Sequence, residues 1–379
     1  MLKITKRDLR IGVALSGGGV RASVFHLGVL ARLAADNLLE NVTFISTVSG
    51  GTLVTGLIYS ISDNRWPTSE VFLNYSEPQA KYYLTTFDLQ KDVIMRSIMR
   101  PWYLRQGRAK VVSLSMQHCW GVSGRLNDIP LEPRWVLNAT TYETGRNWRF
   151  IPQKRMGDYI ANYVKEPDIL LSDAMAASAA YPGLIGPLRL DTKKYEWFNY
   201  EGKREVPAEQ PFKTLHLWDG GLYDNLGMES LFKLQGSTYR DEINFLLASD
   251  ASPGITLERH PFLLSKRAFR LVGIAMDQVR GLRARTLVNY FEEEANRGVY
   301  LKMGNTSRKI FTDAGTDREF MDELTRDCLS DIEVKKAVNF PTTLRRLSET
   351  EYDLLFQHGW EVTNCTLQSW CPDLFRYIV

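Results

Sequence analysis

The stretch Ile11-Gly-Val-Ala-Leu-Ser-Gly-Gly-Gly-Val-Arg-Ala22 decides how the rest of the chain is interpreted. Residues 11–15 form a short apolar run typical of a buried strand, and three successive glycines follow at 17–19. Apolar residues then recur at helical spacing across 24–33. A strand, a glycine turn and a helix start direct backbone N–H groups and the positive end of the helix dipole at one point, which favours an anion there. Arg21 adds a positive charge beside this turn.

A second strand–turn–helix unit follows and contains a serine. Its apolar strand ends in Thr47-Val-Ser49-Gly-Gly51, and an apolar helical stretch begins directly afterwards. This is the arrangement of a nucleophile elbow, in which a serine sits on a sharp turn between small neighbours. The usual pattern is G-x-S-x-G, and Thr47 stands at its first glycine. The strand–turn–helix context still favours Ser49 as a candidate nucleophile.

A third motif lies far downstream, at Trp218-Asp219-Gly-Gly221. Residues 215–218 have strand character and deliver Asp219 to a glycine turn. A carboxylate brought close to Ser49 would take the serine proton as a general base.

Each motif alone has a simpler interpretation. A glycine-rich loop after a strand is also typical of a nucleotide-phosphate site or of a plain tight turn. The dinucleotide spacing G-x-G-x-x-G fails at residues 21–22, and no lysine follows for G-x-x-x-x-G-K-[ST]. An isolated serine in such a turn is usually structural. The glycine turn and the serine turn, one strand–helix unit apart, are far more specific together.

The sequence resembles the patatin-like phospholipase family in three motifs that occur in the same order: the glycine turn with its arginine, the serine turn and the Asp-Gly-Gly turn. That family is similar to the catalytic domain of cytosolic phospholipase A2. The resemblance extends over roughly residues 10–252, and the further matching segments are Leu137-Asn-Ala-Thr140 with Gly145, 174–183 and 220–227. It implies a three-layer α/β fold with a central, mostly parallel sheet and helices on both faces. The chain departs from the family pattern at Thr47 and at Ala22, where many patatins have glycine.

The resemblance also implies the residues of the site. Ser49 would be the nucleophile and Asp219 the base of a Ser–Asp dyad that works without histidine or a metal. The oxyanion hole would be formed by backbone N–H groups of the glycine turn, with the arginine supporting the loop: Gly17, Gly18, Gly19 and Arg21. No cofactor and no calcium ion are expected, because no ligand cluster is visible in the sequence.

Composition and charge limit the classes of function. The chain has 379 residues, 44% of them hydrophobic and 24% charged, with a net charge of +3, which is ordinary for a globular protein and too mild to indicate a nucleic-acid polymer as partner. No signal peptide is visible, and no window approaches the roughly 18 apolar residues that span a bilayer. We therefore expect a cytoplasmic protein that touches a membrane peripherally.

The cysteines lack metal-ligand spacing and are interpreted as free thiols: Cys119, Cys328, Cys365 and Cys371.

Two segments allow both a membrane interpretation and a packing interpretation. Residues 68–127 mix aromatic and basic side chains, which suits a lid or a membrane-interface patch, or an insertion that packs its aromatics onto the core. Residues 266–290 predict a long basic amphipathic helix that docks on an anionic membrane or packs its apolar side on the domain. The expected apolar face of that helix consists of Leu271, Ile274, Ala275, Val279, Leu282 and Leu287.

These observations lead to one main functional hypothesis and two alternatives. We expect residues 1–252 to form the catalytic domain, with 68–127 inserted in it and 253–379 as a mainly helical extension packed on it. The resemblance implies a calcium-independent lipid acyl hydrolase of the phospholipase A or lysophospholipase type, with membrane phospholipid as substrate. The first alternative is a latent membrane-degrading effector, or a lipid-binding protein with little basal activity, that waits for a small-molecule activator. The second is an acyltransferase or esterase with a soluble substrate.

Overall fold

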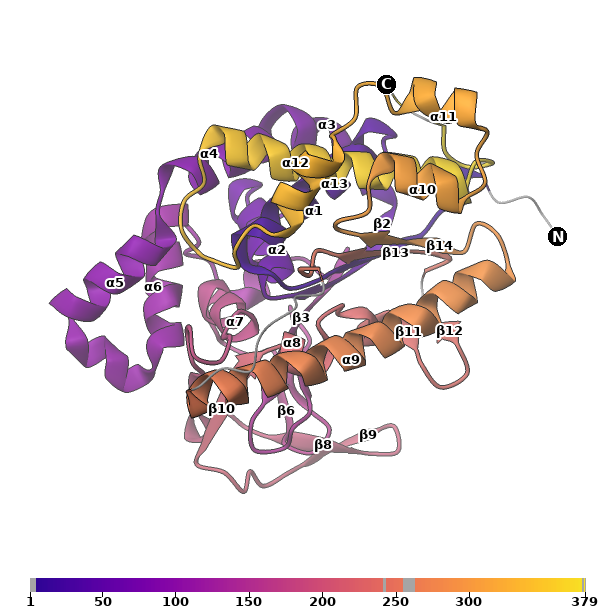
Figure 1. The fold of residues 1–379 in the computed structure, drawn as a ribbon. Helices are drawn as coiled ribbons and strands as arrows, with labels where there is room; N and C mark the ends of the chain where they lie inside the picture. The colour runs from indigo at the N-terminus through magenta and orange to yellow at the C-terminus, as the bar shows by residue number, and fades with distance from the viewer. Residues whose placement is uncertain (1–4, 241–242, 255–262, 377, 379) are drawn as a thin grey trace.

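The computed structural model describes residues 5–240, 243–254, 263–376 and 378 (Figure 1). Within these ranges the chain builds a 12-stranded mixed sheet that is parallel from its edge strand β14 (Gly298–Lys302) as far as β3 (Arg134–Thr141). The parallel strands lie in the order β14, β13 (Phe245–Asp250), β1 (Ile11–Leu15), β2 (Val42–Val48) and β3. The predicted α/β fold with a parallel core is confirmed.

From β3 outward the sheet becomes antiparallel. This part contains β4 (Asn147–Ile151), β5 (Arg155–Asp158), β6 (Asn162–Lys165), β8 (Phe198–Glu201) and β9 (Arg204–Pro207). The last part of β3 also pairs with β10 (Thr214–Asp219), which in turn pairs with β7 (Leu188–Asp191). A separate hairpin is formed by β11 (Phe232–Lys233) and β12 (Thr238–Tyr239). The antiparallel strand β10 carries one of the predicted site residues.

Helices cover both faces of the sheet, as the three-layer prediction requires. One face is covered by α1 (Gly19–Ala35), α2 (Gly50–Ile61), α7 (Leu171–Ser178) and α13 (Glu349–Trp370), and the other by α8 (Gly221–Asp224) and α9 (Leu264–Glu293) (Figure 1). Strand β1 shows why two layers are needed. Val13 and Leu15 belong to the larger hydrophobic cluster and Ala14 to the smaller one, because successive side chains of a strand point to opposite faces.

Residues 68–127 form a helical insertion, of which α5 (Leu89–Met99) and α6 (Arg108–Trp120) project on the left of Figure 1. The insertion also contains α3 (Ser69–Val71), α4 (Glu77–Thr86) and the 3-10 helix η4 (Pro101–Gln106). Helix α6 packs its buried side on α7, while α5 lies outside α6 and exposes most of its length. Within the insertion, α4 and α6 pack on the rest of the domain and α5 is the outer helix.

The segment after residue 252 is part of the same sheet. It supplies β14, which pairs in parallel with β13, and the helices α10 (Ser307–Asp313), α11 (Arg318–Leu324), α12 (Asp331–Val338) and α13. Helix α13 packs directly on α1 at two facing glycines. A Cβ atom on Gly28 would lie 2.1 Å from the Phe356 carbonyl oxygen, and one on Gly359 would lie 2.0 Å from the Phe25 carbonyl oxygen. The expected helical extension thus also completes the core.

Helix α9 does not pack most of its predicted apolar face on the domain, so the packing interpretation of residues 266–290 is wrong. Of the predicted apolar face, Leu271 and Leu282 are exposed and Leu287 is buried. The inward side carries arginines instead, because Asp250 and Asp224 are buried and need cationic partners (contacts with Arg280 and Arg283, both 2.8 Å). A buried carboxylate without a partner would cost more than the exposure of a few leucines. Across the described residues, α9 included, no helix is both long and apolar enough to span a bilayer.

Candidate active site

Two strands that share one edge of β3 bring Ser49 and Asp219 together. Strand β2 runs parallel to β3 and its last residue, Val48, pairs with Asn138. Strand β10 runs in the opposite direction, and its last residue, Asp219, pairs with the next residue of β3, Ala139. The two strands therefore approach each other end to end. The residue after β2 and the last residue of β10 meet at the same point of the sheet.

Ser49 occupies the sharp turn between β2 and α2. Its backbone has φ +48° and ψ −116°, a region that side-chain-bearing residues rarely adopt and that costs about 1–3 kcal/mol. The turn fits because its neighbours lack side chains: a Cβ on Gly50 would lie 2.3 Å from the Gly19 carbonyl oxygen. The Ser49 N–H donates to the Ser178 hydroxyl at 3.0 Å. This turn exposes the serine hydroxyl to the adjacent cavity and is consistent with a nucleophile elbow.

Thr47, the departure from the usual elbow pattern, has a structural role. Its side-chain oxygen accepts hydrogen bonds from the Trp135 indole N–H at 3.0 Å and from the Thr52 hydroxyl at 2.8 Å. All three side chains are buried. A glycine at this position would leave the indole N–H without that acceptor, and a buried unpaired donor costs about 1–3 kcal/mol.

Asp219 is buried beside Ser49 and accepts a hydrogen bond from the Ser49 hydroxyl. The Gly221 N–H also donates to it, at 2.7 Å. Burial raises the pKa of Asp219 to about 6, although both hydrogen bonds act to lower it. The carboxylate is therefore ionised at neutral pH and yet basic enough to take a proton.

The glycine turn lines the same cavity as Ser49 and has two backbone N–H groups that could bind an oxyanion. The Gly17 N–H donates to the Asn225 carbonyl oxygen at 3.2 Å and is therefore not available to an oxyanion. Of the three glycines expected to donate, Gly18 and Gly19 remain. The N–H groups of Gly18 and Gly19 have no hydrogen-bond partner among the residues that the structure describes. Position 17 requires a glycine because a side chain would not fit there. An added Cβ atom would lie 2.5 Å from the Asn225 side-chain oxygen and 3.1 Å from Ser49 Cβ.

Arg21 lies under the glycine turn and is almost fully buried. Its Nη1 donates to the Phe340 carbonyl oxygen at 2.7 Å. Burial lowers the pKa of Arg21 to about 10, against the favourable charge of Asp250, so the guanidinium stays protonated at neutral pH. Its Nε and Nη2 atoms find no partner within the described part of the chain. Arg21 therefore places a positive charge next to the glycine turn, where a Cβ atom on Gly18 would lie 3.1 Å from its Nη2.

Sequence reasoning assigned no function to two further residues that support the turn. His26 Nε2 lies 2.9 Å from the Ser16 carbonyl oxygen, which can only accept, so this nitrogen carries the proton. The other ring nitrogen then accepts from the Ser249 hydroxyl at 2.9 Å, and burial lowers the pKa of His26 to about 4. Asn225 holds Gly17 through its carbonyl oxygen. In the sequence, His26 is only a histidine two helical turns after a glycine loop, and this pattern does not predict its contact with the Ser16 carbonyl oxygen.

A cavity of about 590 Å³ opens over the dyad and the glycine turn. The first half of α9 forms one wall, and loops around Leu184 and Thr343 form others. The apolar lining consists of Leu53, Leu184, Ile185, Phe269, Met276 and Leu344, and the cationic lining of Arg21, Lys266, Arg270 and Arg280. The combination suits a molecule with an acyl chain and an anionic or polar head.

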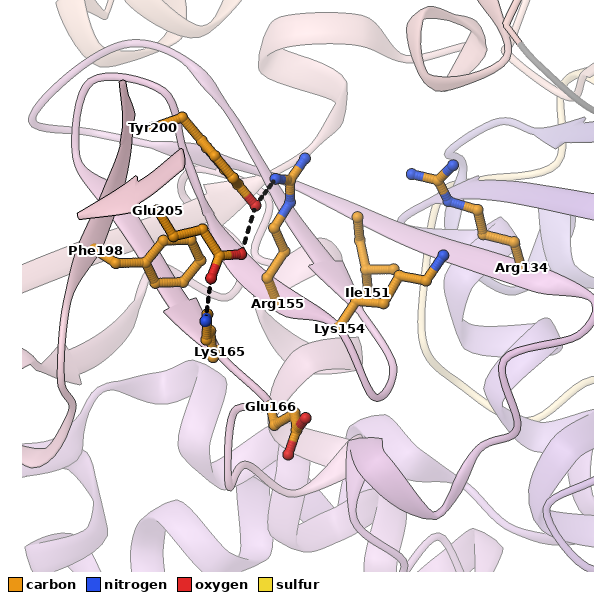
Figure 2. A pocket seen from close by; sticks show the side chains of 9 residues that line it. All are labelled: Arg134, Ile151, Lys154, Arg155, Lys165, Glu166, Phe198, Tyr200 and Glu205. Atoms are coloured by element: carbon orange, nitrogen blue, oxygen red, sulfur yellow. Dashed lines mark hydrogen bonds and ion pairs between the residues drawn. The ribbon is translucent and has the colours of Figure 1, made fainter. Parts of the chain in front are cut away.

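A second pocket, of about 440 Å³, lies among the antiparallel strands and is drawn in Figure 2. Much of its charge is paired internally: Lys165 forms an ion pair with Glu205, and Arg155 Nη1 donates to the Tyr200 hydroxyl at 2.8 Å (Figure 2). This pocket does not include Ser49 or Asp219.

One group of side chains has the spacing of metal ligands. Asp92 on α5 and His118 and Cys119 on α6 bring ligand atoms within 4.8 Å of one another, a proximity that the spacing of the cysteines did not indicate. Arg96 already contacts the Asp92 carboxylate at 2.5 Å and balances its charge. None of these residues lines the cavity at Ser49 and Asp219.

Replacing Gly19 with alanine is expected to lower activity about 100-fold. Gly19 has φ +63°, and an added Cβ would lie 2.7 Å from the Thr343 carbonyl oxygen, so the turn must move and misplace its N–H donors. Loss of one oxyanion donor typically costs about 100- to 1000-fold in rate. Gly145→Ala is the matched control, because Gly145 also has φ +63° but has nothing within 4 Å of the added atom. Equal ester hydrolysis by the two variants would contradict the assignment of the turn.

Several known proteins are similar to this chain in sequence. A family model described as patatin-like phospholipase matches residues 13–232. A patatin-like phospholipase domain-containing protein of Aspergillus clavatus is 27% identical over 253 residues, which cover 65% of this chain and 30% of that protein. A similarly described protein of Yarrowia lipolytica is 25% identical over 264 residues, covering 66% of this chain and 28% of that protein. In these matches the chain spans less than a third of the relatives' length.

Similarity to solved structures concerns the fold. Human GIVD cytosolic phospholipase A2 superposes with a TM-score of 0.53 at 16% identity, covering 95% of this chain and 59% of that chain. The same human protein in complex with methyl gamma-linolenyl fluorophosphonate inhibitor and terbium chloride gives a TM-score of 0.50 at 14% identity, over 95% and 58% of the two chains. Because the family model covers more than half of the sequence, the chain belongs to the patatin-like phospholipase family.

Proposed function

We propose that the chain hydrolyses fatty-acyl esters of membrane phospholipids through an acyl-enzyme on Ser49. The observation that carries the proposal is the hydrogen-bonded pair of Ser49 and Asp219 at a cavity lined by both apolar and cationic side chains. The family membership of the chain supports a lipid as the substrate.

The proposed reaction has two acyl-transfer steps. Ser49 Oγ attacks the ester carbonyl while Asp219 accepts the hydroxyl proton, and the tetrahedral oxyanion lies against the N–H groups of Gly18 and Gly19. The intermediate collapses, the C–O bond to the alcohol breaks, and the alcohol leaves with the proton from Asp219. Water then attacks the acyl-enzyme, Asp219 takes the water proton and returns it to Ser49, and a fatty acid is released.

Two side chains suffice because the backbone supplies the remaining stabilisation. Ser49 directly precedes Gly50, the first residue of α2, so the positive end of that helix dipole faces the developing alkoxide. Among the described residues of the cavity wall, Asp219 and Asp277 are the carboxylates, and Asp219 serves as the base. We therefore propose that the reaction needs no calcium ion, whose sites use several oxygen ligands.

Fatty-acid release from mixed phospholipid vesicles tests this function. We expect the same rate with a chelator and with added calcium. Loss of activity in the chelator would contradict the calcium-independent mechanism. Hydrolysis of dispersed short-chain esters, without hydrolysis of vesicles, would favour an esterase with a soluble substrate. A very low rate that rises when a small nucleotide is added would favour the latent, ligand-activated alternative.

The pH dependence of kcat/KM is expected to report the base. Asp219 must be ionised to accept a proton, and its pKa is raised to about 6. Below that pH the protonated form dominates, so kcat/KM should fall about tenfold per pH unit, and above it the profile should level off. The measurement uses a dispersed ester between pH 4.5 and 8. A profile that is flat from pH 4.5 upward would contradict the role of Asp219.

A further inference from the structure

The outer helix of the insertion ends in a cluster of exposed apolar side chains, here called the tip: Ile94, Met95, Ile98, Met99, Trp102 and Leu104. Ile94 and Ile98, like Met95 and Met99, are four residues apart and therefore share one face of α5. Ile98 is 71% exposed and Trp102 is 56% exposed. The exposure of so many apolar side chains to water is unfavourable, which indicates that another surface covers this face when the protein functions.

The outward side of α9 carries a second set of apolar side chains, here called the stripe: Leu264, Leu271, Val272, Ile274, Val279 and Leu282. Leu264, Leu271 and Leu282 are separated by seven and eleven residues, spacings that return to nearly the same line of an α-helix. Leu271 is 66% exposed. The opposite side of the helix is fixed by the ion pairs of Arg280 and Arg283, so the stripe cannot turn inward without breaking them.

The tip and the stripe are joined by the loop that borders the catalytic cavity. The Arg189 side chain donates to the Arg105 carbonyl oxygen at 3.1 Å and ties this loop to η4. At the other end of the loop, a Cβ on Gly183 would lie 2.5 Å from the Phe269 ring of α9. Leu184 stands between these contacts, 54% exposed, and lines the cavity. In Figure 1 the α5–α6 hairpin and the first turns of α9 lie on the same side of the molecule.

Charge around the tip favours an anionic surface. Residues 89–110 contain six basic residues and one acidic residue, Asp92. Arg96 pairs with Asp92 of the same segment, and Lys110 pairs with Asp173 of α7. The remaining basic side chains of the segment are exposed: Lys91, Arg100, Arg105 and Arg108. Apolar and aromatic side chains interleaved with arginines are typical of segments that enter the headgroup region of a bilayer.

We propose that the tip and the stripe together form the surface by which this protein docks on an anionic phospholipid membrane. Helix α9 carries the stripe on its outward side and forms a wall of the cavity at Ser49, so docking brings an acyl chain close to Ser49 without carrying it through water. The proposal rests on the proposed lipid substrate. It adds that the side with the tip and the stripe faces the bilayer, and that the protein prefers anionic lipid.

Vesicle flotation in a Ser49→Ala background tests the surface without hydrolysis of the lipid. The probe is vesicles of phosphatidylcholine with phosphatidylglycerol, compared with phosphatidylcholine alone. The tip variant is Ile98→Asp with Met99→Asp, and the stripe variant is Leu264→Asp with Leu271→Asp. We expect the parent to prefer the anionic vesicles and each variant to lower the partition coefficient about tenfold or more. Added salt should weaken binding of the parent.

The control variant is Phe320→Asp with Ile332→Asp. These side chains are 50% and 79% exposed on α11 and α12, away from the cavity, and the variant adds the same charge. It should bind vesicles like the parent, and thermal unfolding should show that all variants are folded. A tip or stripe variant that binds like the parent would overturn the proposal, as would a parent that does not bind.

The same samples separate this proposal from its alternatives. A second copy of the chain is the competing occupant, so light scattering without vesicles is measured as well. A parent dimer that the tip and stripe variants dissociate would overturn the membrane assignment. Because flotation uses the Ser49→Ala protein, its outcome does not depend on catalysis. Failure of the proposed function appears instead as absent fatty-acid release by the protein with Ser49 intact.

Discussion

Ser49→Ala is expected to abolish fatty-acid release, with a loss of at least about 1000-fold, while the protein remains folded. The variant removes the hydroxyl that donates to Asp219 in the cavity, and water held in the cavity cannot form the acyl-enzyme. Alanine fills the same turn and has the same positive φ to adopt, so the free energy of unfolding should change little.

The matched control for this variant is Ser60→Ala. Ser60 lies near the end of α2 and its hydroxyl donates to the Gly121 carbonyl oxygen, away from the cavity lining. We expect this variant to release fatty acid at the rate of the natural protein. Full activity in a pure Ser49→Ala preparation would contradict the assignment of the nucleophile.

Asp219→Asn should remove nearly all activity and at the same time stabilise the fold. Asparagine retains an oxygen for the Gly221 N–H but cannot accept the Ser49 proton, so we expect a rate loss of about 1000-fold or more. The effect on stability has the opposite sign. Folding raises the pKa of this carboxyl from 3.8 to about 6, so the folded state disfavours the charge that the unfolded chain carries freely.

The raised pKa of Asp219 determines the pH range in which its ionised carboxylate destabilises the folded state. Above pH 6 the ionised carboxylate costs the folded state about 1–3 kcal/mol, and the cost disappears as the pH falls through 6 toward 3.8. Asp219→Asn should therefore raise the free energy of unfolding at pH 7.5 and have little effect near pH 4. Urea unfolding at the two pH values measures this difference. Retained activity, or destabilisation at pH 7.5, would contradict the account of Asp219.

Much of the candidate site is visible in the sequence because its parts are local. A strand, a run of glycines and a helix leave a pattern in consecutive residues, and both Ser49 and Asp219 stand at such turns. Their meeting is not local. It depends on β10 running antiparallel to β3 and ending opposite Ala139, directly after the β3 residue that pairs with the end of β2. Only the family resemblance predicted that the two turns would come together.

Other features needed contacts that the sequence does not reveal. The Gly17 N–H is taken by Asn225, about two hundred positions away, so the donor set of the turn could not be counted in advance. The face of α9 was assigned by apolar periodicity, but Asp250 and Asp224 decide it, because both lie buried beneath the helix. Periodicity identifies a helix, whereas the partner beneath it determines which side turns inward.

Covalent labelling of the protein with a long-chain alkyl fluorophosphonate tests the central claim most directly. An activated serine attacks the phosphorus, an O–P bond forms and fluoride leaves, so the product is a stable adduct that peptide mass spectrometry can locate. The account predicts one adduct per chain, on the peptide that contains Ser49, with none in Ser49→Ala and much slower labelling in Asp219→Asn. An adduct on a different residue, or labelling that persists at the natural rate in Ser49→Ala, would show that the nucleophile has been misassigned.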